Sequence, residues 1–261
     1  MFRPERAFVL AAVAAAGVFG AGCGKSDLVR QGETASTPAQ RTPAHAPAPA
    51  APPAAVAVPL KLTAASAGEF AKGVNLLPVD VPGSHRTPRS ANLESQKEEA
   101  GDCGGNEAQT IGGGRSAKLD RGAELNTESI SSSVIVMRSA RAAQADLSYA
   151  ESPAGLACYG KILRKKLDGE STSGLNVGHV VVSHLTVASS QGPTARGIRI
   201  TARISGKTSG VTISLFVDAV AFDYGPAEIE LYATSFVQPV AERTEEGLLA
   251  VMQQRARLGT L

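Results

Sequence analysis

The sequence predicts an α+β domain: a mostly antiparallel sheet, made of a four-strand C-terminal meander plus one earlier strand, covered by three to four helices. Apolar and polar residues alternate from Val177 to Ala233, which is the period of half-buried strands. Apolar residues recur at helical spacing in 153–167 and 242–258. The first quarter of the chain has neither pattern, so we expect a single domain over residues 61–261.

The chain begins with the features of an export signal. Arg3 and Arg6 precede an uncharged, small and apolar run over 7–21. That run is shorter than the about 20 residues that a membrane-spanning helix needs. We therefore interpret residues 1–22 as a signal peptide.

At the end of the apolar run, residues 20–24 read Gly-Ala-Gly-Cys-Gly and resemble the lipobox of bacterial lipoproteins. Gly20 stands where lipoboxes usually have Leu, Val or Ile. The resemblance implies cleavage before Cys23 and lipidation of Cys23, which anchors the chain at the extracytoplasmic face of the cell membrane. An ordinary signal peptide, with Cys23 as an incidental thiol, is the alternative.

The cysteine count agrees with lipidation. The chain has 3 cysteines, and acylation of Cys23 leaves Cys103 and Cys158 as an even pair for an oxidising compartment. Their disulfide would close a loop of about 55 residues and stabilise the fold by about 2–4 kcal/mol. The alternative, two buried reduced cysteines, requires a cytoplasmic protein and conflicts with the signal peptide.

Residues 23–60 predict a disordered tether, because 43–59 is nearly all Pro, Ala and Val. Repeated prolines remove backbone donors and favour an extended, semi-rigid chain. The net charge is +2, without the clustered Lys and Arg that phosphate contacts need, so we exclude nucleic acid as a partner.

The folded part begins with a helix over 67–77, in which Phe70, Val74 and Leu77 share one face. Thr63 or Ser66 could cap this helix, and Pro78 is expected to end it. The polar, glycine-rich segment 84–128 is expected to be a long functional or mobile loop. A buried strand over 129–137 follows.

Two helices, 140–150 after Ser139 and one beginning at Ser152-Pro153, are expected next. Four strands then form the meander, with turns near residues 191–193, 206–210 and 224–226. The amphipathic helix 242–258 is expected to cover the dry face of the sheet. The other face is expected to be wet.

The histidines do not predict a metal centre. His45 lies in the tether, His85 in a loop, and His179 and His184 in one strand with an odd separation that places them on opposite faces. No C-x-x-C pair accompanies Cys103 or Cys158. We therefore expect structural roles for His179 and His184, no metal and no cofactor.

Catalytic patterns are equally weak. The serines lie mostly in polar loops without a nucleophile elbow, and the phosphate-loop-like 206–208 has Thr201 where the motif needs glycine. Glu228 and Glu230 are expected to keep a sheet face solvated. Asp218, with Asp223 at the end of the same strand, is expected to be a structural carboxylate rather than an acid–base group.

Three segments carry a family resemblance: 70–83 (FAKGVNLLPVDVPG), 157–160 (ACYG) and 225–236 (GPAEIELYATSF). They resemble secreted lipoproteins of actinobacteria and, more loosely, the PknH-like extracellular sensor domains of mycobacterial kinases. The resemblance implies an extracytoplasmic α+β domain with a cleft that senses or binds a ligand, and no catalytic residues.

The sequence thus favours a non-catalytic, membrane-tethered binding or sensing module of the cell envelope, for a small or lipid-like ligand. An envelope protein–protein interaction module is the first alternative. A hydrolase is the second.

Overall fold

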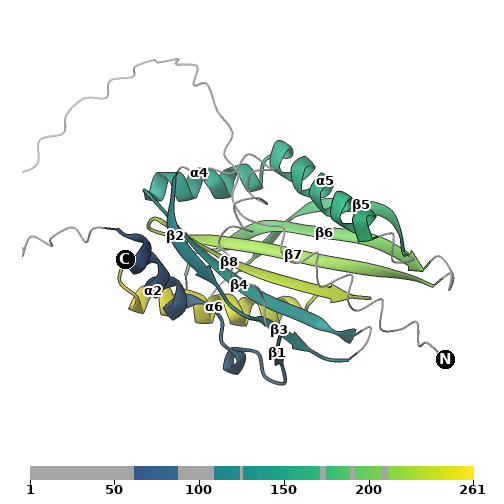
Figure 1. The fold of residues 1–261 in the computed structure, drawn as a ribbon, viewed down its shortest axis with the longest axis horizontal. Helices are drawn as coiled ribbons and strands as arrows, with labels where there is room; N and C mark the ends of the chain where they lie inside the picture. Colours follow the sequence, from purple (N-terminus) through teal and green to yellow (C-terminus); the bar gives the residue numbers. More distant parts are fainter. Residues whose placement is uncertain (1–61, 88–108, 124–125, 171–174, 189–191, 207–210) are drawn as a thin grey trace, which may run out of the picture. The chain divides into compact units, whose positions relative to one another are not determined.

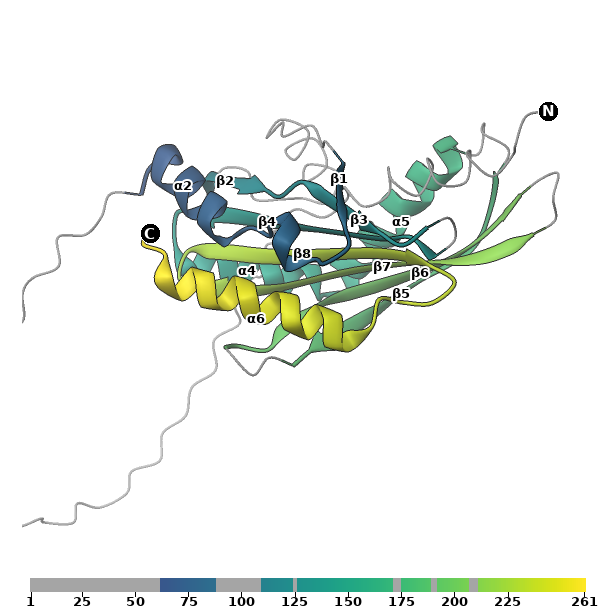
Figure 2. The same ribbon diagram turned by 90° about the horizontal axis from the view of Figure 1, so that it is seen from below.

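The computed structural model describes residues 62–87, 109–123, 126–170, 175–188, 192–206 and 211–261. The predictions for the signal peptide, Cys23, the tether, His45 and Cys103 lie outside these residues. Within them, the chain forms an eight-stranded sheet with helices packed on both faces (Figures 1 and 2).

The sheet has the order β1-β3-β4-β8-β7-β6-β5, with β2 also pairing with β4, and every pairing is antiparallel. The expected meander is its C-terminal half. In chain order, the strands are β1 His85–Thr87, β2 Thr110–Arg115, β3 Lys118–Arg121, β4 Glu128–Met137, β5 Leu175–Val187, β6 Ala195–Gly206, β7 Thr212–Tyr224 and β8 Ala227–Phe236.

The α+β class and the antiparallel sheet are confirmed, but the predicted size of the sheet was wrong. Segment 84–128, expected to be one long loop, contributes β1, β2 and β3. Strand β2 was missed because three of its six residues are glycines, which have low strand propensity. Helix α2 (Ala64–Val74) explains them: a Cβ on Gly112 would lie 3.2 Å from the Cα of Ala64, and one on Gly114 3.3 Å from the Cβ of Ala71.

Helix α2 begins where the capping residues predict, but it ends early. Thr63 caps it in a capping box with Ser66. The helix stops at Val74, so Pro78 does not end it and instead begins the short 3-10 helix Pro78–Asp80. Leu77 is therefore 47% exposed rather than part of the buried face.

The other helices agree closely with their predicted ranges. They are α4 Ala140–Ala150, capped by Ser139, α5 Pro153–Glu170, whose Gly155 amide donates to Ser152, and α6 Glu242–Leu258. None of the helices in the described ranges is both long and apolar enough to cross a membrane.

Two hydrophobic cores lie on opposite faces of the sheet. Helices α2 and α6 pack on the first face, where Phe70 and Leu249 meet Phe222 and Ile229. Helix α5 packs on the second face, where Tyr159 and Leu163 join a cluster with isoleucines of β6. The expectation of one wet face was wrong, because α4 and α5 cover it (Figure 1).

Candidate functional site: an acidic cavity beneath α4

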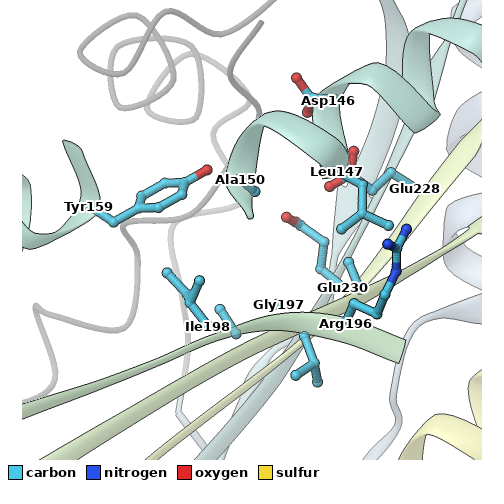
Figure 3. A pocket seen from close by; sticks show the side chains of 12 residues that line it. Asp146, Leu147, Ala150, Tyr159, Arg196, Gly197, Ile198, Glu228 and Glu230 are labelled. Atoms are coloured by element: carbon cyan, nitrogen blue, oxygen red, sulfur yellow. The ribbon is translucent and has the colours of Figure 1, made fainter. Parts of the chain in front are cut away.

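A small cavity of about 30 Å³ lies on the second face, between the sheet and helices α4 and α5. Four of its lining residues carry acidic or phenolic groups: Asp146, Tyr159, Glu228 and Glu230. Figure 3 shows the Tyr159 hydroxyl pointing from α5 toward the Glu230 carboxyl, with α4 above both glutamates. The cavity therefore brings groups from two helices and three strands together.

The alternation of β8 places both glutamates in this cavity. Ile229 and Leu231 point to the α2–α6 core, so Glu228 and Glu230 point to the opposite face. They are only 3% and 6% exposed. The prediction that they keep a sheet face solvated was wrong, because it took the face opposite the core to be open to water.

Helix α4 supplies the third carboxyl group. Asp146 is 1% exposed and lies on the buried side of the helix with Ala142, Ala143 and Leu147. The side chain of Ser139 accepts a hydrogen bond from the Ala142 amide and so fixes the first turn of α4. This cap therefore helps to hold Asp146 over the sheet.

The surroundings of Glu228 favour its protonated form. Burial raises the pKa of Glu228 well above its ordinary value, and the nearby Asp146 and Glu230 raise it further. A hydrogen bond between the Glu228 and Asp146 carboxyls requires a proton on one of them. Glu228 Oε2 has no hydrogen-bond partner among the residues that the structure describes.

Glu230 sits in a more polar part of the same cavity. Burial raises its pKa to about 7, opposed by a hydrogen bond from Tyr232 and by the charge of Arg115. The Tyr232 hydroxyl donates to Glu230 Oε2 at 2.6 Å. Burial also raises the pKa of Tyr159 above its ordinary value. These phenols therefore stay protonated and act as donors at neutral pH.

Arg196 brings positive charge to the rim of the cavity, in addition to the charge of Arg115 that acts on Glu230. Arg196 lines the cavity, but its Nη1 lies 3.0 Å from Glu151 and its side chain is 46% exposed. Asp223, at the end of β7, has its pKa raised by burial, against the lowering effect of Arg196.

A second buried acidic group lies on the opposite face, beneath α6. Arg199 donates two hydrogen bonds to Asp218, at 2.6 and 2.7 Å, which agrees with the structural role expected for Asp218. Glu245 faces this pair from α6 and is 1% exposed. Burial, and then Asp218, raise the pKa of Glu245 to about 9.

Sequence reasoning missed Asp146 and Glu245, although a signal was present in both helices. Glu245 is spaced by three and four residues from Leu248 and Leu249, and Asp146 by four and three from Ala142 and Ala143. Each therefore occupies a buried position of its amphipathic helix. An acidic residue at such a position indicates a buried carboxyl group.

The remaining candidate residues do not converge on a site. His179 and His184 are exposed on β5, and neither lines the cavity. His85 is exposed in β1. Cys158 is half-buried beside the α5 core, and its pairing with Cys103 stays a prediction. Within the described ranges, no three His, Cys, Asp or Glu residues are grouped so that they could hold a metal ion.

Three serines lie inside the sheet. Ser131, Ser132 and Ser133 are buried in β4, within the buried strand predicted over 129–137. Ser132 donates to Asn75 Oδ1 at 2.8 Å and accepts from the Leu76 amide at 2.9 Å. It therefore ties the end of α2 to the sheet.

Comparisons with known proteins give only weak structural similarity. No protein-family model matches the chain. No curated protein matches it either. Among solved structures, it is similar to the extracellular domain of PknH from Mycobacterium tuberculosis, at 9% identity and a TM-score of 0.28, over 58% of this chain and 68% of that one.

Proposed function

We propose that this chain is an exported lipoprotein whose folded domain is a non-catalytic sensing or binding module on the extracytoplasmic face of the cell membrane. The observation that carries the proposal is the order of features before the fold. A basic start and an apolar run lead into Cys23, and a Pro-Ala segment then reaches to residue 59. Such a segment separates a domain from its anchor without packing against it.

The cysteines also support an extracytoplasmic location. Lipidation of Cys23 leaves Cys103 and Cys158, and a disulfide between them suits an oxidising environment. Cys158 lies on α5, next to the second core, so this disulfide would fasten the segment around Cys103 to the helix that walls the cavity.

The cavity indicates what kind of ligand the module senses. Pockets for drug-sized ligands measure about 300–1,000 Å³, whereas the acidic cavity measures about 30 Å³. Its walls carry three carboxyl groups. A small polar species therefore fits this site better than a lipid-like one.

Metabolic labelling tests the anchor. We expect the wild-type chain in an expressing bacterium to incorporate labelled palmitate, and Cys23→Ser to incorporate none. Cys158→Ser is the matched control, because it removes a cysteine without removing the lipid, and we expect it to be labelled. Labelling of Cys23→Ser to the wild-type level would contradict the proposal.

A protein–protein interaction module is the second candidate, and strand β5 favours it. Its 13 residues contain no Lys, Arg, Asp, Glu or Pro, and it pairs only with β6 among the described strands. Native edge strands usually carry such residues to prevent pairing with other chains. Binding of another envelope protein that Val181→Lys abolishes and Glu228→Gln preserves would favour this candidate.

A further inference from the structure

The acidic cavity holds more acidic groups than the described arginines near it can balance. Asp146, Glu228 and Glu230 line it, whereas Arg196 binds Glu151 at the rim and the charge of Arg115 acts on Glu230. Once these carboxyl groups ionise, a neutral water molecule in the cavity would leave their repulsion unchanged. A bound cation would offset it.

One carboxyl oxygen of Glu228 lacks a hydrogen-bond donor among the described residues. Its side chain is 3% exposed, yet Oε2 finds no hydrogen-bond partner in the described part of the chain. Buried polar atoms in folded proteins nearly always have a partner, so an exception in a cavity wall calls for one. A group that enters the cavity can supply that donor.

Size and geometry restrict that group. The volume of about 30 Å³ exceeds the about 10–15 Å³ that one water molecule needs, so the cavity has room for only a very small group. The described acidic side chains are not grouped as metal ligands. An ammonium group is nearly the size of water, carries a positive charge and has three donors when attached to carbon.

We propose that the cavity beneath α4 binds one ammonium group, from a small amine or from a lysine side chain, between Glu228, Asp146 and Glu230. Glu228 Oε2 accepts one of its hydrogen bonds. The inference rests on the proposed function only in naming this cavity as the sensing site. The ammonium site itself is testable whether or not the chain is lipidated.

Binding is coupled to release of a proton. Because the raised pKa of Glu228 keeps a proton in the empty cavity, the ammonium group must displace that proton. Apparent affinity therefore rises with pH, by up to about tenfold per pH unit for one proton released. The charged and titratable groups that face the cavity from its elements are Asp146, Tyr149, Tyr159, Arg196, Asp223, Glu230, Tyr232 and Arg115.

Thermal unfolding of the full chain in detergent tests the site. Ammonium chloride is compared with potassium chloride at equal ionic strength, because potassium is similar in size but donates no hydrogen bond. We expect ammonium to raise the Tm more than potassium does, and this excess to be larger at pH 8 than at pH 6. Equal shifts from the two salts would overturn the proposal.

Substitutions in the cavity test whether the excess shift in Tm arises there. We expect Glu228→Gln to lose the excess shift, and Glu242→Gln, an exposed position on α6 beyond the opposite face, to keep it. Glutamine resembles the protonated acid in size and polarity, so the fold should survive this substitution. Asp146→Asn is a second cavity variant, and we expect it to lose the excess shift in Tm as well. An excess shift that persists in both cavity variants would overturn the proposal.

Two further arms distinguish the sources of the ammonium group. A response to methylamine without one to a lysine-containing peptide assigns the site to small amines. A response to the peptide, absent when its lysine is acetylated, assigns the site to a lysine side chain. Failure of the lipid anchor leaves these results unchanged, so the two proposals fail separately.

Discussion

The buried carboxylate of Asp218 depends on Arg199 to balance its negative charge. It is 1% exposed, and the guanidinium of Arg199, whose side chain is 27% exposed, donates a hydrogen bond to each of its oxygens. Removing one partner of such a pair leaves an uncompensated buried charge.

We therefore expect Arg199→Ala to lower the free energy of unfolding by about 3 kcal/mol, measured by urea denaturation. Arg203→Ala, at an exposed position of the same strand, should change it by less than about 0.5 kcal/mol. Adding Asp218→Asn to Arg199→Ala should restore part of the loss. Equal effects of the two arginine substitutions would contradict the structural role of the pair.

Glu245 makes stability depend on pH. Its folded pKa of about 9 exceeds the ordinary value of 4.5, so between these values the folded state holds one more proton than the unfolded state. The free energy of unfolding therefore falls as pH rises through that window, by up to about 1.4 kcal/mol per unit for each such group. Its contribution is fully present below pH 4.5.

Denaturation at pH 5 and pH 8 measures this effect. Glu245→Gln should lose less stability than the wild-type chain between the two pH values, because its amide does not ionise. Glu246→Gln, at the next position of α6, should follow the wild-type profile. Identical profiles for Glu245→Gln and the wild-type chain would rule out the raised pKa of Glu245.

At the scale of elements, helix boundaries were predictable wherever a local signal fixed them. Ser139 and Ser152 mark the starts of α4 and α5, because their side chains cap the first turns. The strands β5 to β8 followed from their alternation. Strand β2 could not be read from sequence, because Gly112 and Gly114 serve the close packing of α2 rather than strand propensity.

The cap of α4 offers a test of how this helix is held over the cavity. Ser139→Ala should lower the free energy of unfolding by about 1 kcal/mol, because it removes a hydrogen-bond acceptor from the first turn. Ser148→Ala, at an exposed position within the same helix, is the matched control. It should cause no comparable loss, because alanine has the higher helix propensity. A loss of similar size in both variants would contradict the capping role.

For the whole molecule, the class of fold followed from sequence, and the site did not. Alternation separates the two faces of β8, but it does not reveal that α4 and α5 cover the second face and so bury Glu228 and Glu230. Which face a helix covers is set by long-range packing. The layout before residue 60 rests on local composition alone, lies outside the described residues and stays a prediction.

The intact mass of the chain isolated from bacterial membranes tests the central claim most directly. We predict a mature protein that begins at Cys23 and carries the added mass of a lipid on that residue, with Cys103 and Cys158 lighter by two hydrogens as a disulfide. An unmodified Cys23 in a chain recovered from the soluble fraction would contradict the claim.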